Sequence, residues 1–443
     1  MKEHHVKSFF RYMILTVAAM LVSGLYQIID GAFIGHYVGS NGLGAINTVW
    51  SILSLIIGIG LMIGVGTGAV ASIFRGQKNH YKATSTLANG FILIGLFSVV
   101  GALLLHFTFP TLVSLQTSDK DVIKLSHKYL NVIIWCLPFL IGSTAIPFFI
   151  RNDGKPVIAT LLMLFGAAIN IVLDYLLIGY FHMNMQGAAI ATVIAQSVTS
   201  ILGSLYFYSD RATLRLHFRD IKFSLTIMLR IVAIGLSSLF MYLYWGVMVG
   251  LHNSQFSWYG GTTALGAYAV LGYFVTFYYL TIEGVANSLQ PLASFHYGEE
   301  KLAPIRELLK ISLCIVMLLG GTLYLLLYLF PGPLLSVFTG SDDNLFDVAS
   351  QGAKIHLFAL AFDGFLVVSA AFYQSVHCAK KAIAITIGNI IVQPPLLWLL
   401  PKWFALDGVW LAYPLSNIML SLFVGALLLR DIPKILGPIA PRF

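Results

Sequence analysis

Four carboxylates interrupt the long apolar stretches of this chain. They are Asp30, Asp174, Glu283 and Asp363. The other fourteen of the eighteen acidic residues fall in predicted loops or at helix ends. A charged side chain at the centre of a bilayer costs about 2.5–3.5 kcal/mol on insertion scales, so such residues are rare unless they are functional. We expect these acids to bind an ion or a proton, or to neutralise a cationic substrate; the alternative is a structural hydrogen bond between helices.

Residue spacing around two of these acids predicts an oxygen-rich site in the first half of the chain. Asn170 and Asp174 are four residues apart and share one face of a helix. The next apolar run carries a polar stripe at helical spacing, made of Thr192, Gln196 and Thr199. Asp30, one turn after Gln27, can meet them from the first run. Carboxylate, amide and hydroxyl oxygens suit a small hard cation, or a proton shared between two acids; the alternative is an interhelical hydrogen-bond network.

A different polar set follows in the second half. One face of an expected helix carries Thr276, Glu283, Asn287 and Gln290. Asp363 lies on a later run, two turns after His356, whose side-chain type changes charge most readily near neutral pH. Side chains that can line a cavity for an organic cation are Tyr26, Gln27, Asn47, Trp50, Gln196, Phe277, Tyr279 and His356. For each of these the alternative is ordinary packing.

The elements that carry these residues are predicted to be transmembrane helices. The chain has 443 residues, of which 58% are hydrophobic and 10% are charged, and its mean hydropathy is +0.85. A soluble domain carries about 25% charged residues. The composition excludes a cytosolic enzyme, a disordered chain and a nucleic-acid binder, despite the net charge of +8. Twelve apolar runs approach or exceed the roughly 20 residues that a span needs: 12–36, 44–73, 85–108, 129–149, 157–180, 187–208, 224–250, 265–296, 308–330, 353–376, 382–400 and 406–429.

The distribution of basic residues predicts the orientation of these spans. With a cytoplasmic amino terminus and alternating spans, 21 of the 26 Lys and Arg residues fall in cytoplasmic segments. Cytoplasmic loops are the ones that carry this excess. We therefore expect both termini to be cytoplasmic.

The two halves of the chain resemble each other. A shift of 222 positions aligns Leu43-Gly44-Ala45 with Leu265-Gly266-Ala267, without a gap. The fold predicted is an all-α integral membrane protein with twelve transmembrane helices in two pseudo-symmetric lobes of six. Its domains are an amino-terminal lobe (1–210), a cytoplasmic linker (211–222) and a carboxyl-terminal lobe (223–443). Such repeats commonly hold a substrate site at their interface and alternate its access. The acids break the repeat, since Asp30 falls opposite His252.

Glycines crowd the second run, at positions 58, 60, 64, 66 and 68. Small residues at this density indicate close helix packing. The alternative is a helix that bends during gating.

Sequence motifs of common enzymes are missing. The chain has no HExxH, GxSxG, Walker lysine loop or CxxC motif, and its three cysteines show no metal-ligand spacing. We therefore expect neither an enzyme nor a bound cofactor. Without a nucleotide site, transport draws on an ion gradient or runs passively.

The chain resembles the MATE family of multidrug and toxin extrusion transporters. The motifs that carry the resemblance are Ile29-Asp30-Gly31-Ala32-Phe33-Ile34-Gly35-His36, Leu43-Gly44-Ala45-Ile46-Asn47, the glycine-rich stretch ending at Ser72 to Gly76, Arg151-Asn152-Asp153-Gly154-Lys155-Pro156, Asn170-Ile171-Val172-Leu173-Asp174, and Glu283-Gly284 through Gln290-Pro291 to Tyr297-Gly298. They occur in the family's order over nearly the whole chain.

The resemblance implies a V-shaped pair of lobes and antiport of organic, often cationic compounds against Na⁺ or H⁺. Residues that match the family's amino-lobe cation site are Asp30, Asn170, Asp174 and Thr192. Substrate binding or proton coupling in the carboxyl lobe is predicted for Glu283, Asp363, Asn287 and Gln290. Glu283 on the eighth span indicates the bacterial multidrug-exporter branch. Small-molecule substrates, a monomer in the bacterial cytoplasmic membrane and no metal other than Na⁺ follow from the same resemblance.

The chain departs from the family's pattern at two positions where relatives have prolines associated with helix bending. Many relatives have a proline about fifteen residues before the first-helix Asp, where this chain reads Ile14-Leu15-Thr16-Val17. A second proline, common early in the second helix, is Trp50 here. A cycle with a straight first helix, or coupling to Na⁺, is therefore favoured. The alternative function, a lipid-linked saccharide flippase of the same superfamily, needs a cationic cavity, whereas the charges inside the predicted spans are acidic.

Overall fold

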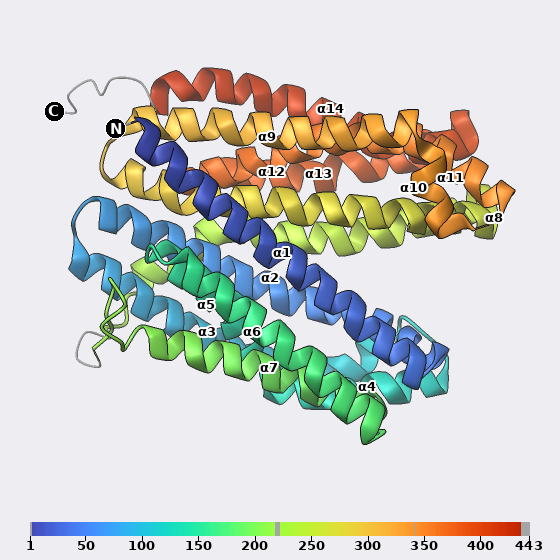
Figure 1. Cartoon of the computed structure of the whole chain (residues 1–443), viewed down its shortest axis with the longest axis horizontal. Helices are drawn as coiled ribbons and strands as arrows, with labels where there is room; N and C mark the ends of the chain where they lie inside the picture. The colour runs from blue at the N-terminus through green and yellow to red at the C-terminus, as the bar shows by residue number, and fades with distance from the viewer. Residues whose placement is uncertain (1, 218–221, 341, 436–443) are drawn as a thin grey trace. The chain divides into compact units, whose positions relative to one another are not determined.

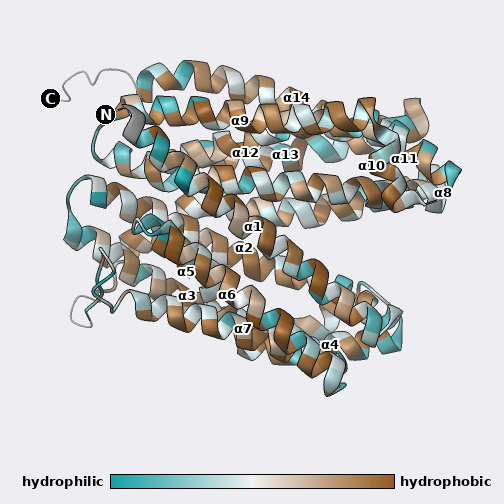
Figure 2. Cartoon of the chain, viewed as in Figure 1, coloured by the Kyte–Doolittle hydropathy of each residue, from teal (hydrophilic) through white to brown (hydrophobic). Residues whose placement is uncertain are grey.

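Helices make up the regular secondary structure of the computed structural model over the residues that it describes, 2–217, 222–340 and 342–435 (Figure 1). Residues 218–221 of the predicted linker and 436–443 of the predicted carboxyl-terminal lobe lie outside the described residues, and so do the basic residues Arg219 and Arg442. Apolar residues follow the lengths of the helices, and hydrophilic residues gather at their ends (Figure 2). This is the distribution expected of spans that cross a membrane.

The helices account for the twelve predicted spans. Within the described ranges, ten helices are long and apolar enough to cross a membrane, and the bent pair α4–α5 brings the number to eleven. The 74-residue α8 holds two of the predicted spans, because Gly261, at a φ of 63°, breaks the helical geometry between them. Only glycine adopts such a conformation without steric cost. The predicted all-α membrane fold is confirmed.

Two compact units divide the chain. We call Ala18–Leu243 the amino unit, and Met1–Val17 with Tyr244–Phe443 the carboxyl unit. The beginning of α1 (Lys2–Tyr37) therefore belongs to the carboxyl unit, and the beginning of α8 (Leu225–Gly298) belongs to the amino unit. The predicted domains 1–210, 211–222 and 223–443 follow the order of the repeats along the chain and stay a prediction.

The amino unit is built around α2. Besides its parts of α1 and α8 it contains α2 (Ser40–Gly76), α3 (His80–Ser114), α4 (Lys120–Trp135), α5 (Leu137–Asn152), α6 (Pro156–Asp174), the π-helical turn η1 (Tyr175–Tyr180) and α7 (Asn184–Tyr206). Helix α2 packs against α3, α4 and α5, while α7 packs against α4, α5 and α6. The glycines of α2 allow close approach of its neighbours: a Cβ on Gly64 would lie 3.0 Å from Cα of Ala145 on α5, and a Cβ on Gly66 would lie 2.1 Å from the carbonyl oxygen of Ile231 on α8. The geometry thus supports the close-packing interpretation of the glycine run.

The carboxyl unit has a matching set of helices. They are the second part of α8, α9 (Leu302–Leu329), α10 (Pro331–Thr339), α11 (Asp343–His356), the short 3₁₀ turn η3 (Leu357–Ala359), α12 (Leu360–Ser375), α13 (Ala379–Leu399) and α14 (Pro401–Ile435). Helix α12 packs against α9, α13 and α14. The start of α1 contributes Phe9, which is fully buried in the core of this unit. A Cβ on Gly284 would lie 2.7 Å from Cα of Val17, so α1 and α8 also pack closely here.

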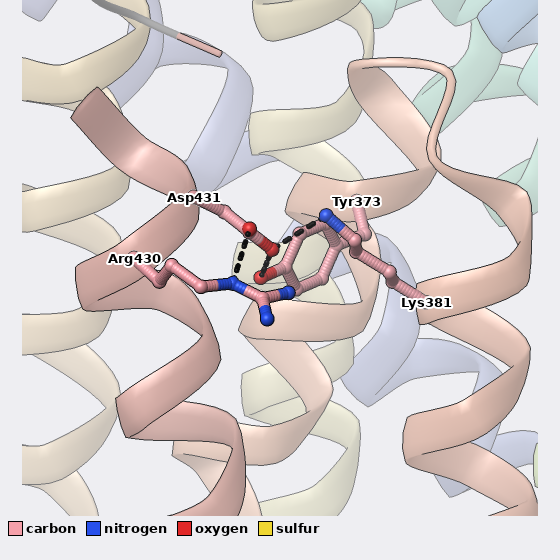
Figure 3. Close-up of polar contacts among 4 residues, drawn as sticks. All are labelled: Tyr373, Lys381, Arg430 and Asp431. Atoms are coloured by element: carbon pink, nitrogen blue, oxygen red, sulfur yellow. Dashed lines mark hydrogen bonds and ion pairs between the residues drawn. The ribbon is translucent and has the colours of Figure 1, made fainter. Parts of the chain in front are cut away.

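A buried acid ties three helix ends together in the carboxyl unit (Figure 3). Asp431 on α14 accepts hydrogen bonds from Lys381 Nζ on α13 at 2.6 Å and from the Tyr373 hydroxyl on α12 at 3.0 Å. The neighbouring Arg430 adds a third contact, from Nε, at 3.3 Å. Only 4% of the Asp431 side chain is exposed. The cluster therefore satisfies a buried charge and joins α12, α13 and α14.

Another buried acid fixes the start of the linker in the amino unit. Asp153 follows α5 and accepts hydrogen bonds from the backbone nitrogens of Thr213 and Leu214, both at 2.8 Å, and from the Tyr206 hydroxyl at 2.5 Å. Asn89 on α3 holds the other end of the linker, through the carbonyl of Lys222 and the backbone nitrogen of Ser224. The described parts of the linker are therefore anchored to the amino unit.

Candidate functional site

Two carboxylates from distant parts of the chain meet inside the amino unit. Asp30 lies on α1 and is partly buried, and Asp174 is the last residue of α6 and is fully buried. Their carboxyl groups face each other within hydrogen-bonding range. Asn170, one turn before Asp174, is also buried. The structure therefore brings together three of the four residues predicted for the amino-lobe cation site.

Four oxygens of this cluster have no hydrogen-bond donor within reach among the residues that the structure describes. They are Oδ1 of Asp30, Oδ1 of Asn170 and both carboxylate oxygens of Asp174. Buried polar atoms in proteins are nearly always paired, and an unpaired buried charge is costly. Two facing carboxylates also repel each other unless a proton or a cation lies between them. This donor-poor, oxygen-rich cluster is therefore suited to a small hard cation or to a shared proton.

Tyrosines complete the surroundings of the acidic pair. Tyr129 on α4 is buried, lies near both acids and is hydrogen-bonded to Thr192 on α7. Tyr26 on α1 is linked to Gln196 and is close to Asp30. Thr192 thus reaches the site through Tyr129. The sequence-based prediction did not include Tyr129, because a tyrosine near the start of an apolar run carries no signal that separates it from packing residues.

Other predicted residues of the amino unit lie outside the acidic cluster or at its margin. Thr199 is buried, and its hydroxyl donates to the carbonyl of Ala195 at 3.0 Å. Gln27 and Asn47 are exposed, and Trp50 is partly buried. Their predicted role in lining a cavity stays a prediction.

Tyrosines surround the predicted acid Asp363 in the carboxyl unit. Asp363 on α12 is buried and hydrogen-bonded to Tyr413 on α14. The Tyr244 and Tyr278 side chains lie close enough to interact electrostatically with it. Tyr244 in turn donates to Gln393 on α13, and Tyr278 donates to the carbonyl of Val316 at 2.8 Å. The acid therefore lies in a polar, aromatic environment drawn from four helices of one unit.

His356 adjoins this environment. Its ring stacks on Tyr413 with 4.7 Å between centroids, and its Nδ1 lies 3.2 Å from the carbonyl oxygen of Trp410. The ring of His252, the repeat-related counterpart of Asp30, lies 5.7 Å from that of His356. A carbonyl oxygen only accepts, so Nδ1 of His356 carries a hydrogen. Tyr413 thus contacts both Asp363 and His356, which the sequence analysis placed two turns apart on one run.

Remaining predicted residues of the carboxyl unit lie mainly along α8. Glu283 is buried, and the Gln290 side chain donates to the Ser294 hydroxyl at 3.2 Å. Asn287 is partly buried, and its Nδ2 has no acceptor in reach within the described part of the chain. Phe277 is 59% exposed, and Tyr279 lies 6.2 Å from the ring of Trp245. Substrate or proton coupling at Glu283 and Asp363 stays a prediction.

Comparison with known families decides the classification. The model of the MatE family matches residues 16–176 and 233–399, once in each half of the chain. This chain belongs to the MatE family. The two matches agree with the internal repeat and confirm the resemblance drawn from the sequence motifs.

Curated relatives of this MatE protein carry the name Multidrug export protein MepA. The one from Staphylococcus saprophyticus is 25% identical over 410 residues, which is 92% of this chain and 90% of the relative. The one from Staphylococcus haemolyticus is 25% identical over 407 residues, covering 91% and 88%. The likeness thus extends over nearly the full length of both chains.

Solved structures with the same fold include a MOP superfamily transporter from Pyrococcus furiosus, described as having a binding pocket of reverse polarity that suggests a different function. It matches with a TM-score of 0.90 at 20% identity, over 97% of this chain and 96% of that chain. Structures of MATE in the bent and in the straight conformation match with the same TM-score, identity and coverage. At this identity the likeness establishes the fold.

Proposed function

We propose that this MatE protein is a multidrug efflux transporter that exports organic cations across a bacterial cytoplasmic membrane in exchange for Na⁺ or H⁺. The observation that carries the proposal is the group of unpaired oxygens on Asp30, Asn170 and Asp174. A static structural role would leave these buried atoms unsatisfied, whereas a coupling ion satisfies them on each cycle. The full-length likeness to proteins named for multidrug export supports the efflux assignment.

The coupling ion enters the amino unit at the acidic pair. Binding of Na⁺, or of a proton shared between Asp30 and Asp174, removes the repulsion between the carboxylates. Tyr129 and Thr192 complete the polar surroundings from α4 and α7. A unit with a neutralised pair packs differently from one with two free charges. Ion binding therefore shifts the equilibrium between the transporter's states, which is the requirement for coupling.

The carboxyl unit supplies the groups for an organic cation. Asp363 offers a negative charge beside Tyr244, Tyr278 and Tyr413, and aromatic faces attract cations. Glu283 is a second buried acid in the same unit.

A membrane potential of 100 mV supplies about 2.3 kcal/mol per charge moved, which sustains a substrate gradient of nearly two decades.

Transport into sealed vesicles tests the proposal. Purified protein is reconstituted, and uptake of a fluorescent organic cation such as ethidium is followed while Na⁺ and pH gradients are imposed separately. One of the gradients should drive uptake in the wild type, and neither should drive it in Asp30→Asn. Asp121→Asn, an exposed acid at the start of α4, is the matched control and should transport normally.

Uptake that ignores both gradients, or that is the same in Asp30→Asn and the wild type, would refute ion coupling at this site. Movement of a lipid-linked saccharide in the same vesicles, without movement of the organic cation, would instead favour the flippase alternative.

A further inference from the structure

An apolar groove of about 820 Å³ runs along the amino unit between α6 and α7. Its walls come from the first half of α6, including Leu161 and Phe165, and from the last turns of α7, including Leu202 and Leu205. These four side chains are between 44% and 60% exposed. Both helices are long and apolar enough to cross a membrane, so we expect these exposed apolar side chains to face lipid.

The length of the groove matches one leaflet of a bilayer. Its lining along α6 extends from Ile158 to Phe165, which at 1.5 Å per residue is about 11 Å. One half of a 30 Å hydrocarbon core is about 15 Å thick. The groove therefore takes up most of the depth available to an acyl chain in one leaflet.

The linker end of the groove is polar and positively charged. Ser209 and Arg211 complete its lining where α7 passes into the linker. Arg211 is exposed, and its guanidinium has no ion pair within residues 2–217, 222–340 and 342–435. Its neighbour Arg215, by contrast, pairs with Asp210 at 2.5 Å. An unpaired arginine at the boundary of the hydrocarbon is placed to hold a phosphate.

The start of α6 adds to this charge. Pro156 is its first residue, and Lys155 before it is exposed. Among the described residues, no side chain caps this helix end with a hydrogen bond. The N–H groups of Ile158 and Ala159 are bonded to the carbonyl of Lys155, so the contribution of this helix end is its dipole, which favours an anion.

We propose that this groove binds an anionic phospholipid from the leaflet on the linker side. The acyl chain lies against Leu161, Phe165, Leu202 and Leu205, and the phosphate lies between Arg211 and the start of α6. The headgroup of a zwitterionic lipid carries a positive group beside its phosphate, so its attraction to Arg211 is weaker. The site is separate from the acidic cluster, and it stands whether or not the proposed ion coupling is correct.

Native mass spectrometry of the purified full-length protein tests this site. The protein is titrated in detergent with phosphatidylglycerol or phosphatidylethanolamine, and the bound fraction of each is measured. The wild type should retain phosphatidylglycerol preferentially, and Arg211→Gln should weaken that retention about fivefold, the effect of one basic residue near an anionic surface. Arg215→Gln, whose arginine is already paired, should change retention less than twofold.

Three results would overturn the proposal. Equal losses in Arg211→Gln and Arg215→Gln would indicate general attraction to basic loops. Unchanged retention in Arg211→Gln would place the lipid elsewhere. Displacement of the lipid by glycerol phosphate at equal concentration would show that the apolar groove contributes nothing. A filling variant, Leu205→Trp, provides a check that does not involve charge and should reduce retention of both lipids.

Discussion

Tyr206 donates its phenolic hydrogen to Asp153 at 2.5 Å, where α7 and α5 of the amino unit end. In the carboxyl unit Tyr373 donates to Asp431 at 3.0 Å, but here the tyrosine lies on α12 and the acid on α14 (Figure 3). The 222-residue offset places α5 on α12 and α7 on α14. The same contact thus joins equivalent helices with the two residue types exchanged, which hides it from a comparison of the repeats by sequence.

Asp153→Asn should destabilise the amino unit by about 1.5–3 kcal/mol. Each oxygen of Asp153 accepts a backbone N–H, from Leu214 or from Thr213. In either orientation, the NH₂ group of an asparagine side chain would therefore face one of these two N–H donors. Thermal unfolding in detergent measures the loss. Asp210→Asn, which breaks an exposed pair, should cost less than about 1 kcal/mol. An equal effect of the two substitutions would show that Asp153 does not anchor the linker.

Lys381→Met should cost more stability than Arg430→Met. The Lys381 contact to the buried Asp431 is 2.6 Å long and the lysine is 33% exposed, whereas the Arg430 contact is 3.3 Å long and the arginine is 58% exposed. We expect about 1–3 kcal/mol for the first and less than about 1 kcal/mol for the second. Thermal unfolding in detergent measures both losses. A larger loss in Arg430→Met than in Lys381→Met would contradict this account of the cluster.

Gly235→Ala should disturb the packing of α8 on α2 by about 1–3 kcal/mol. A Cβ at Gly235 would lie 1.8 Å from the carbonyl oxygen of Met62, and neither backbone can yield easily. Gly95→Ala on α3 is the matched control, because no atom of the described residues from outside its own helix lies within 4 Å of its Cβ position. The control should be neutral or slightly stabilising, since alanine is the better helix former. Equal unfolding temperatures of the two variants would count against close packing.

Asp30→Asn and Asp174→Asn should each abolish most gradient-driven export, and the double variant should be no worse than either single one. The two carboxyl groups face each other and act as one site, so their effects are not additive. Uptake rates in vesicles under the driving gradient measure this. Additive losses would mean that the two acids serve separate sites.

Glu299→Gln should lower stability at neutral pH and have no effect in acid. Burial opposes ionisation of Glu299, but hydrogen bonds from Lys301 and His296 outweigh it and hold the pKa of its carboxyl below the ordinary value of 4.5. A carboxyl group whose pKa is lowered in the folded state stabilises that state at pH values above its ordinary pKa. This contribution is lost as the pH falls through the folded-state pKa. We expect a difference of about 1 kcal/mol at pH 7. A difference that persists at pH 3 would exclude ionisation as its cause.

Much of the candidate site was predictable because its cues are local. Asn170 and Asp174 share a helix face by spacing alone, and an acid in an apolar run is conspicuous in any sequence. Tyr129 and Tyr413 could not be found this way, because aromatic residues in spans are common and only their partners reveal a role. The buried Asp153 and Asp431 lay outside the predicted spans' centres, so they read as ordinary loop and helix-end acids.

Length and hydropathy by themselves predicted twelve spans, because the thickness of a bilayer sets how many consecutive apolar residues a helix needs. The 222-residue repeat in the sequence showed that the two halves are related. Tertiary structure alone decided which helices share a unit. The start of α1 packs with the carboxyl unit and the start of α8 with the amino unit, through contacts such as Gly284 with Val17 and Gly66 with Ile231. Such pairings depend on the fit of side chains far apart in the sequence, and hydropathy, which averages over neighbours, contains no record of that fit.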